Sequence, residues 1–303
     1  MVELKIDLFD FELNPPLILA SGILDQTAGT MKRIANKGVG GIVTKSIGKE
    51  SREGHPNPTV VELETGLLNA MGLPNPGIKE FKIELDKLQE SVKQKPVIGS
   101  IFASNSEDFA ELAQKMAKYG ADMIELNLSC PHAEGYGASI ASDDEMMIEV
   151  INKVTERIEE PVLAKLPPST EIARKAALAE KSGSDAIVCI NTLRAMAINF
   201  ETQEPILGNK IGGYSGKGIK PIGLRCVFEV YKEVDIPVIG CGGITNGRDA
   251  LEYVLAGASA LQIGTAFHVI GKRAPRRITE EMKELMNKEN INDLSKLIGE
   301  AHS

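Results

Sequence analysis

Eight short apolar segments, each with at least one β-branched residue, recur along the chain of 303 residues with helical stretches between them. This pattern is typical of buried parallel strands that are joined by crossover helices. The segments lie at 16–22, 40–46, 96–102, 122–130, 161–167, 186–192, 237–243 and 260–266. Glycine or polar residues close these strands repeatedly, and the first one is not followed by a GxGxxG signature. The sequence therefore predicts an α/β fold of the (β/α)8 (TIM) barrel class, with residues 1–303 forming a single domain.

Two connections between the predicted strands are too long for simple loops. They span 47–77 after the second strand and 193–220 after the sixth. Long ordered insertions on the C-terminal face of a barrel usually cover a substrate, so we expect both insertions to border the site.

The composition narrows the classes of function. A net charge of -8 argues against a general nucleic-acid footprint and against attraction to anionic membranes. No apolar run approaches the length of a membrane span, and the first residues lack the apolar core of a signal peptide. Four widely spaced cysteines are too few for a disulfide scaffold or a metal site. We expect a cytoplasmic protein that binds no nucleic acid, no membrane and no metal.

Two lysines end predicted strands, where side chains of a barrel face the active site. Lys45 closes the second strand and Lys165 the fifth. One such lysine could equally reach water or pair with a structural carboxylate, whereas two at equivalent strand ends favour an anionic ligand. A Schiff-base role for either remains open, because buried lysines shift their pKa readily.

Glycine pairs end the last two strands. Gly242 and Gly243 follow the seventh strand, and Gly264 with Thr265 follows the eighth. Barrels commonly bind phosphate there through backbone N–H groups, although each pair alone could form a tight turn. Their joint position favours a phosphate site, which the glycine-rich segment 212–221 could help to close.

Cys130 ends the fourth predicted strand and begins a loop that contains glycines. No His and Asp of the hydrolase arrangement lie near it in the sequence, so its thiol suits acid or base catalysis on a carbon acid better than acyl transfer. The other cysteines are interpreted as inert apolar side chains; they are Cys189, Cys226 and Cys241.

Three asparagines fall in the predicted mouth of the barrel, at Asn69, Asn127 and Asn191. Because an amide both donates and accepts, three of them would match the alternating N–H and C=O edge of an imide or pyrimidine ring. The alternative is that each caps a turn, which is the commoner use of one asparagine.

Together these motifs resemble the class 1 dihydroorotate dehydrogenases, most closely the catalytic subunit of the NAD-linked (1B) subclass. The resemblance spans nearly the whole chain through PLILASG, KS, NAMGLPNPG, LNLSCP, AKLPP, INT, SGKGIKPIG, GCGGI and IGTAF, in that order. It implies oxidation of dihydroorotate to orotate in de novo pyrimidine biosynthesis, with one FMN per chain.

The resemblance also implies roles for individual residues. Cys130 would take a proton from C5 of dihydroorotate while hydride leaves C6 for flavin N5, and Lys165 would stabilise negative charge on the reduced flavin. FMN would contact Ser21, Lys45, Ser46, Asn127, Lys165, Ile190, Gly216, Gly242, Gly243, Gly264 and Thr265. The substrate would contact Lys45, Asn69, Ala70, Met71, Gly72, Leu73, Asn127, Asn191 and Thr192.

The same resemblance implies a partner. Members of the NAD-linked subclass work with a second subunit that carries FAD and a [2Fe-2S] cluster, so we expect a heterotetramer built on a homodimer.

Two positions depart from the family pattern. Gly99 stands where many members have Asn, so one contact from a side chain to the flavin is expected to be missing. The motif reads SCPH where SCPN is common, and this His also occurs in dihydropyrimidine dehydrogenases. Reduction of uracil-type rings therefore stays open, as do a fumarate-linked class 1A activity, a flavin-free Schiff-base lyase and a silent barrel that only binds a ligand.

Overall fold

A closed barrel of parallel strands forms the centre of the computed structural model, which describes residues 2–92, 95–128 and 138–303. Its strands are β3 (Leu17–Leu19), β4 (Gly41–Val43), β7 (Val97–Ile101), β8 (Met123–Asn127), β9 (Val162–Leu166), β10 (Ala186–Cys189), β15 (Val238–Cys241) and β16 (Ala258–Ile263). They pair in the order β10-β15-β16-β3-β4-β7-β8-β9. Each strand overlaps one predicted segment, which confirms the predicted barrel.

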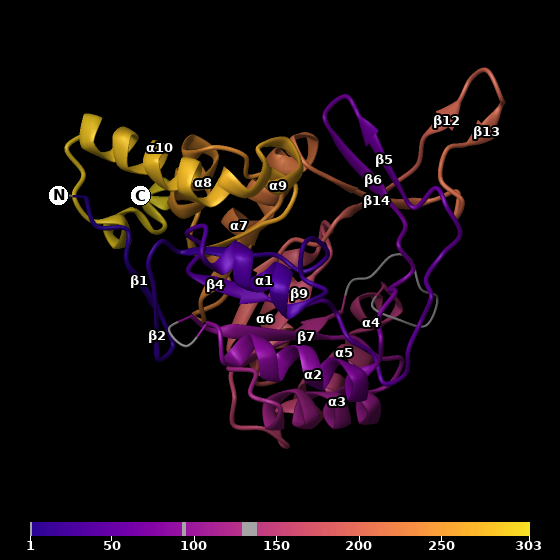
Figure 1. The fold of residues 1–303 in the computed structure, drawn as a ribbon. Helices are drawn as coiled ribbons and strands as arrows, with labels where there is room; N and C mark the ends of the chain where they lie inside the picture. Colours follow the sequence, from indigo (N-terminus) through magenta and orange to yellow (C-terminus); the bar gives the residue numbers. More distant parts are fainter. Residues whose placement is uncertain (1, 93–94, 129–137) are drawn as a thin grey trace.

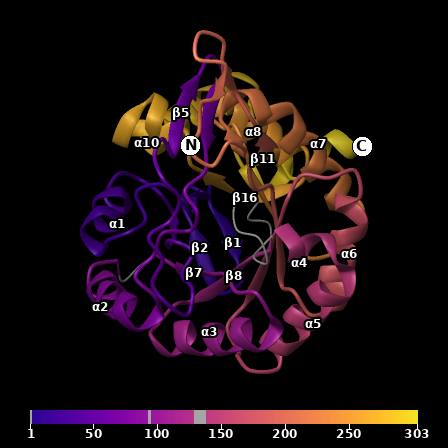
Figure 2. The ribbon, with the colours of Figure 1, turned by 90° about the vertical axis from the view of Figure 1, so that its right-hand side faces the viewer.

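Helices surround the barrel, as Figure 2 shows. They are α1 (Ala28–Ala35), α2 (Ile78–Gln89), α3 (Ser106–Lys118), α4 (Ala138–Ser142), α5 (Asp144–Thr155), α6 (Ile172–Lys181), α7 (Lys220–Tyr231), α8 (Gly247–Leu255), α9 (Ala266–Val269) and α10 (Ala274–Lys288). Short 3-10 helices are η1 (Lys217–Ile219), η2 (Gly271–Arg273), η3 (Leu294–Leu297) and η4 (Glu300–His302). Helix α8 begins where the sequence predicts, because the side chain of Asn246 accepts a hydrogen bond from the N–H of Asp249 at 2.9 Å.

The N-terminal end of the barrel is closed by a hairpin that sequence reasoning did not predict. It consists of β1 (Ile6–Leu8) and β2 (Phe11–Leu13), and its Leu8 and Leu13 are buried. These side chains share one apolar cluster with inward-facing barrel residues: Ile18, Val43, Ile98, Met123, Leu163, Val188, Ile239 and Ala260. In the described part of the chain, this cluster forms an aliphatic plug that closes the amino-terminal end of the barrel.

Two residues after each of these barrel residues, at the end of the strand or just beyond it, the side chain is more often polar. Because side chains alternate across a strand, these positions face the same side as the apolar plug but lie nearer the carboxyl end. They are Ala20, Lys45, Ser100, Glu125, Lys165, Ile190, Cys241 and Gln262. A mostly polar layer therefore lies directly above the aliphatic one.

Both predicted insertions are present, and they meet. The first contributes β5 (Val60–Leu63) and β6 (Gly66–Asn69), and the second contributes β11 (Leu193–Ala195) and β14 (Gly212–Ser215). They form one antiparallel sheet in the order β11-β14-β6-β5, while β12 (Ile198–Asn199) and β13 (Glu204–Pro205) extend from it as a separate hairpin. Figure 1 shows this sheet and hairpin projecting beside the barrel.

In residues 2–92, 95–128 and 138–303, no helix is both long and apolar enough to cross a membrane.

Candidate active site

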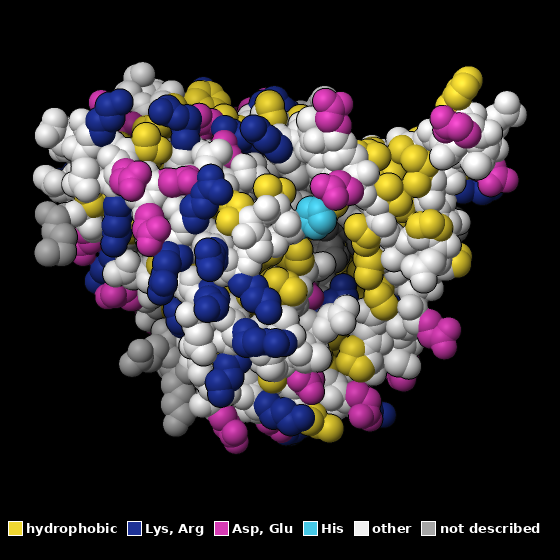
Figure 3. Space-filling view, turned by 45° about the horizontal axis from the view of Figure 1, so that its top comes forward, with side chains coloured by type: hydrophobic (Ala, Val, Ile, Leu, Met, Phe, Trp, Pro, Cys, Tyr) yellow, Lys and Arg dark blue, Asp and Glu magenta, His cyan; other side chains and the backbone are white. Residues whose placement is uncertain are grey.

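A cavity of about 390 Å³ opens at the carboxyl end of the barrel, beneath the sheet of the two insertions. Figure 3 shows a hollow on this face, with hydrophobic side chains along one edge and Lys and Arg side chains gathered on the neighbouring surface. Every described residue predicted to contact the substrate or the cofactor lines the cavity, with the single exception of Ala70. The structure therefore brings together residues from all parts of the sequence.

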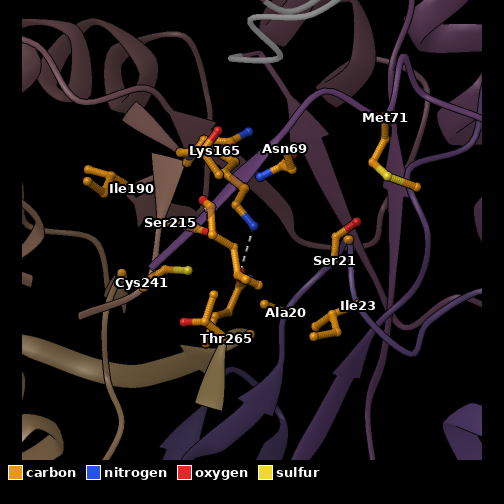
Figure 4. A pocket seen from close by; sticks show the side chains of 18 of the residues that line it. Ala20, Ser21, Ile23, Asn69, Met71, Lys165, Ile190, Ser215, Cys241 and Thr265 are labelled. Carbon is orange, nitrogen blue, oxygen red and sulfur yellow. Dashed lines mark hydrogen bonds between the residues drawn. The ribbon is translucent and has the colours of Figure 1, made fainter. Parts of the chain in front are cut away.

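The floor of the cavity carries a buried ion pair. The Nζ atom of Lys165 donates to Oε1 of Gln262 at 2.7 Å and lies 3.4 Å from Oε1 of Glu125. Burial alone lowers the pKa of Lys165, but the attraction of the Glu125 carboxylate raises the pKa above its ordinary value. The Lys165 side chain therefore presents a fixed positive charge to the cavity, where Figure 4 shows it among the lining side chains.

A chain of hydroxyl and amide groups runs along one wall. The Oγ atom of Ser46 lies 3.2 Å from Oγ of Ser21 and 2.9 Å from Oγ of Ser100, and it accepts from Nδ2 of Asn127 at 3.2 Å. The Nδ2 atom of Asn191 donates in turn to Oδ1 of Asn127 at 3.2 Å. The ends of β3, β4, β8 and β10 are thus joined by polar side chains that face one cavity.

Asp25 is a buried carboxylate behind this wall that sequence reasoning missed. Its Oδ2 atom accepts from the N–H of Gly22 at 2.5 Å and from Oγ of Ser21 at 3.4 Å. Burial raises the pKa of Asp25, while the nearby Lys45 ammonium group lowers it, and the net shift is upward. Asp25 therefore fixes the turn that presents Ser21 to the cavity.

The amide of Asn69 lies in the sheet of the insertions. Its Nδ2 atom donates to the carbonyl of Gly213 in β14 at 3.1 Å, so it also helps to join the two insertions. The structure does not bring Ala70 to the cavity, because its side chain is buried in a separate apolar cluster with Leu68 and Leu207. Alternation along the chain explains this, since Asn69 and Met71 face the cavity on either side of Ala70.

A cradle of glycines forms the far end of the cavity, at the carboxyl end of β15. Gly242 and Gly243 have φ angles of 130° and 71°, which residues other than glycine rarely adopt. A Cβ atom on Gly243 would lie 2.7 Å from the carbonyl oxygen of Gly216 and 3.0 Å from the backbone nitrogen of Lys220. Only glycine permits this close approach of two backbone segments, and the resulting bare surface suits an anion bound by N–H groups.

We expect Gly243→Ala to lower the free energy of unfolding by about 1–3 kcal/mol, because alanine is strained at this φ and its Cβ collides with Gly216. Gly29→Ala in α1 is the matched control, since a Cβ there meets no atom within 4 Å and φ is not positive. The control should leave stability unchanged or raise it by at most about 1 kcal/mol. Thermal unfolding of both variants, followed by circular dichroism, measures the difference; equal stabilities would contradict the strained cradle.

The cysteines fall into two groups. Cys130 lies outside the described residues. Cys241 lines the cavity, yet burial raises the pKa of its thiol, as burial also does for Cys189 and, to about 11, for Cys226. These thiols are therefore neutral near pH 7, in agreement with their interpretation as unreactive.

The prediction about Gly99 was wrong in its premise. A Cβ atom built on Gly99 would lie 2.2 Å from Cγ of Met116 in α3 and 3.0 Å from Cβ of Ala121. The position therefore faces the surrounding helix and not the cavity, so its lack of a side chain removes no contact to a ligand. The next residue, Ser100, faces the barrel interior instead and lies within reach of Ser46 and Glu125.

Sequence reasoning also missed Glu125 and Gln262, although a signal was present. Glu125 precedes Asn127 by two residues within β8, and two residues apart on a strand means the same face. The same rule places Gln262 with Gly264 at the end of β16.

Comparison with known proteins agrees with this geometry. A model of the family described as dihydroorotate dehydrogenase matches residues 3–286. The catalytic subunit of dihydroorotate dehydrogenase B (NAD(+)) from Pyrococcus furiosus is 48% identical over 299 residues, which cover 98% of each chain. The proteins of the same name from Methanocaldococcus jannaschii and Thermoplasma acidophilum are each 45% identical and cover 99% of this chain and 98% and 99% of their own lengths, respectively.

Proposed function

Because the chain belongs to the dihydroorotate dehydrogenase family, we propose that its cavity binds FMN and dihydroorotate and that residues 1–303 act as one FMN-binding barrel domain. The protein is an oxidoreductase that converts dihydroorotate to orotate in pyrimidine biosynthesis. The observation that carries the proposed site is the meeting of a glycine cradle, a buried ammonium group and an amide wall around one cavity.

The residues present fit a flavin mononucleotide. A phosphate dianion needs backbone N–H groups without obstructing side chains, which the ends of β15 and β16 offer at Gly242, Gly243, Gly264 and Thr265. The flat ring needs apolar contacts, for which Ala20 and Ile190 are placed, and polar partners for its pyrimidine edge. The polar candidates are Ser21, Lys45, Ser46, Asn127, Lys165 and Gly216.

The substrate would lie between this site and the sheet of the insertions. Its carboxylate needs a cation, and its alternating N–H and C=O groups need amides that both donate and accept. Asn69, Asn127 and Asn191 supply such amides, and the remaining proposed contacts are Lys45, Met71, Gly72, Leu73 and Thr192. Ala70 is left out of the proposed contacts because its side chain packs elsewhere.

Bound FMN supplies an acceptor for the hydride that leaves C6 of dihydroorotate. Cys130, whose role rests on the family motif, would take the proton from C5. Lys165 holds its positive charge in a water-poor floor, where it can stabilise negative charge without reorganisation. The amides of Asn69, Asn127 and Asn191 would hold the substrate ring in place within the cavity.

We also propose a partner for the electrons. The relatives are named as catalytic subunits of an NAD(+)-linked enzyme, which supports a second subunit. By the family resemblance this subunit carries FAD and a [2Fe-2S] cluster and joins a homodimer of this chain in a cytoplasmic heterotetramer. Fumarate would be the acceptor in the alternative class 1A arrangement.

Anaerobic titration of the purified chain tests the proposed function. The chain should be yellow with FMN bound, and dihydroorotate should bleach the flavin in stoichiometric amounts. NAD alone should then fail to restore the colour, and adding an iron-sulfur flavoprotein partner should allow NAD to restore it.

Other outcomes would favour the alternatives. Reoxidation by fumarate would indicate the class 1A activity, and reduction by NADH followed by conversion of uracil would indicate a dihydropyrimidine dehydrogenase. A colourless chain that borohydride traps with its substrate would replace the proposal with a lysine Schiff base.

A further inference from the structure

The ion pair beneath the cavity is unusual in its surroundings. Glu125 is 0% exposed and Lys165 5%, and both lie directly above the aliphatic plug of the barrel. At equivalent positions two other strands present the aliphatic side chains of Ala20 and Ile190. Because desolvation offsets most of the attraction between buried charges, an ion pair here contributes little more to stability than aliphatic packing would.

Gln262 links the two charged groups in one defined direction. Its Oε1 atom accepts from Lys165 at 2.7 Å, and its Nε2 atom donates to Oε2 of Glu125 at 2.5 Å. An ammonium group can only donate and a carboxylate can only accept, so this orientation of the amide is the one that satisfies both partners. Glu125, Gln262 and Lys165 therefore form a closed triangle contributed by three strands.

A further contact joins Glu125 to the cavity wall through Ser100. Oγ of Ser100 donates to Oε1 of Glu125 at 3.4 Å, and Ser100 lies 2.9 Å from Ser46. Among the described residues, Glu125 thus has three side-chain partners, and each of them lines the cavity or touches a residue that does. The carboxylate is placed to hold the floor of the site and not the outer shell of the barrel.

We propose that Glu125, through Gln262, is a positioning residue that fixes the Lys165 ammonium group at the cavity floor and balances its charge. This inference rests on the proposed binding of FMN. In a water-poor site, a lone ammonium group would strongly favour the reduced, more negative ring of the flavin. The adjacent carboxylate cancels much of that bias, so Glu125 sets the relative affinity of the site for oxidised and reduced FMN.

Two variants of Glu125 separate charge from shape. Glu125→Gln keeps the size of the side chain and its contact with Gln262 but removes the charge, whereas Glu125→Asp keeps the charge and shortens the side chain. A role in charge balance predicts a large redox effect for Glu125→Gln and a small one for Glu125→Asp; a role in packing predicts the reverse ranking. Ser100→Ala removes a hydrogen bond from a hydroxyl group to the same carboxylate but leaves both charges in place.

The measurement is the ratio of FMN dissociation constants in the oxidised and the reduced state. Fluorescence titration of the apo chain gives the first constant. The midpoint potential of the bound flavin, measured by reduction in the presence of a reference dye and compared with that of free FMN, gives the ratio. The measurement is made at about pH 6. In Glu125→Gln, burial lowers the pKa of Lys165 and no carboxylate at position 125 opposes this, so a lower pH keeps Lys165 in its ammonium form. Among the other titratable groups near Lys165, burial raises the pKa of the Cys241 thiol, which is therefore neutral at this pH. Burial also raises the pKa of Asp25, and none of the variants replaces this residue.

We expect Glu125→Gln to shift the ratio about tenfold in favour of reduced FMN, which for a two-electron couple is about 30 mV. Glu125→Asp and Ser100→Ala should stay near the wild-type ratio. An unchanged ratio in Glu125→Gln, or an equal shift in Glu125→Asp, would overturn the inference. A wild-type chain that binds FMN and is bleached by dihydroorotate separates this failure from a failure of the proposed function.

Folding of the variants provides a second test. If Glu125→Gln fails to fold, the double variant Glu125→Gln/Lys165→Met should fold again, because removing both charges relieves the unpaired ammonium group. Thermal unfolding of the apo chains measures this. Rescue would support the charge balance, and a double variant that also fails to fold would contradict it.

Discussion

Replacing Cys130 by Ser is expected to slow the reduction of bound FMN by dihydroorotate by about 10² to 10⁴-fold near pH 7, the usual contribution of a positioned general base. A hydroxyl group ionises far less readily than a thiol, so it removes the C5 proton poorly at this pH. FMN affinity should stay at the wild-type value, because the glycine cradle and Lys165 are unchanged in this variant. Anaerobic stopped-flow spectroscopy of flavin bleaching gives the rate.

Two other thiols make this prediction specific. Cys226→Ser is the control, since Cys226 is buried in α7 and does not line the cavity. Cys241 is the competing assignment, because it is the described thiol that lines the cavity. A large loss in Cys241→Ser together with a wild-type rate in Cys130→Ser would move the base to Cys241. Burial raises the pKa of the Cys241 thiol, which argues against that outcome.

The barrel was predictable because each of its strands can be recognised from a few consecutive residues. Each parallel strand is buried on both faces and therefore consists of mostly apolar residues, such as VIGSI in β7 or VLAKL in β9. The sheet of the insertions was not predictable, since β6 pairs with β14 across a separation of more than a hundred residues. No local pattern encodes such a pairing, and the strands involved are only three or four residues long.

The candidate site also contains residues that the sequence predicts and residues that it does not. Residues at strand ends, such as Lys165 and Asn127, could be found from the rule that the carboxyl ends of barrel strands face the site. Glu125 and Gln262 lie deeper in their strands. A polar residue there could also face outward from the barrel. Only the three-dimensional register shows that Glu125, Gln262 and Lys165 point to one place. Gly99 shows the converse, since a missing side chain matters only on the face that a ligand uses.

Lys165→Met should have the second large effect. Removing the ammonium group takes a preorganised positive charge from the cavity floor, and the loss of one such group typically slows a reaction by about 10² to 10³-fold. The reduction of bound FMN by dihydroorotate should slow accordingly. The variant should also lose about 3–5 kcal/mol of unfolding free energy, because Glu125 then stays buried without its counter-charge. Stopped-flow bleaching and chemical denaturation measure the two effects separately.

Lys175→Met separates catalysis from stability in this comparison. Lys175 is also buried, donates to the carbonyl of Ala141 at 2.6 Å and lies 3.0 Å from Asp144, but it belongs to α6 and does not line the cavity. Its replacement should therefore lower stability while the rate of flavin reduction stays near the wild-type value. If both lysine variants slowed flavin reduction equally, the loss would follow from weakened folding, and the charge of Lys165 would have no special part in the chemistry. If only Lys165→Met slows flavin reduction, the positive charge of Lys165 stabilises the flavin as it receives the hydride.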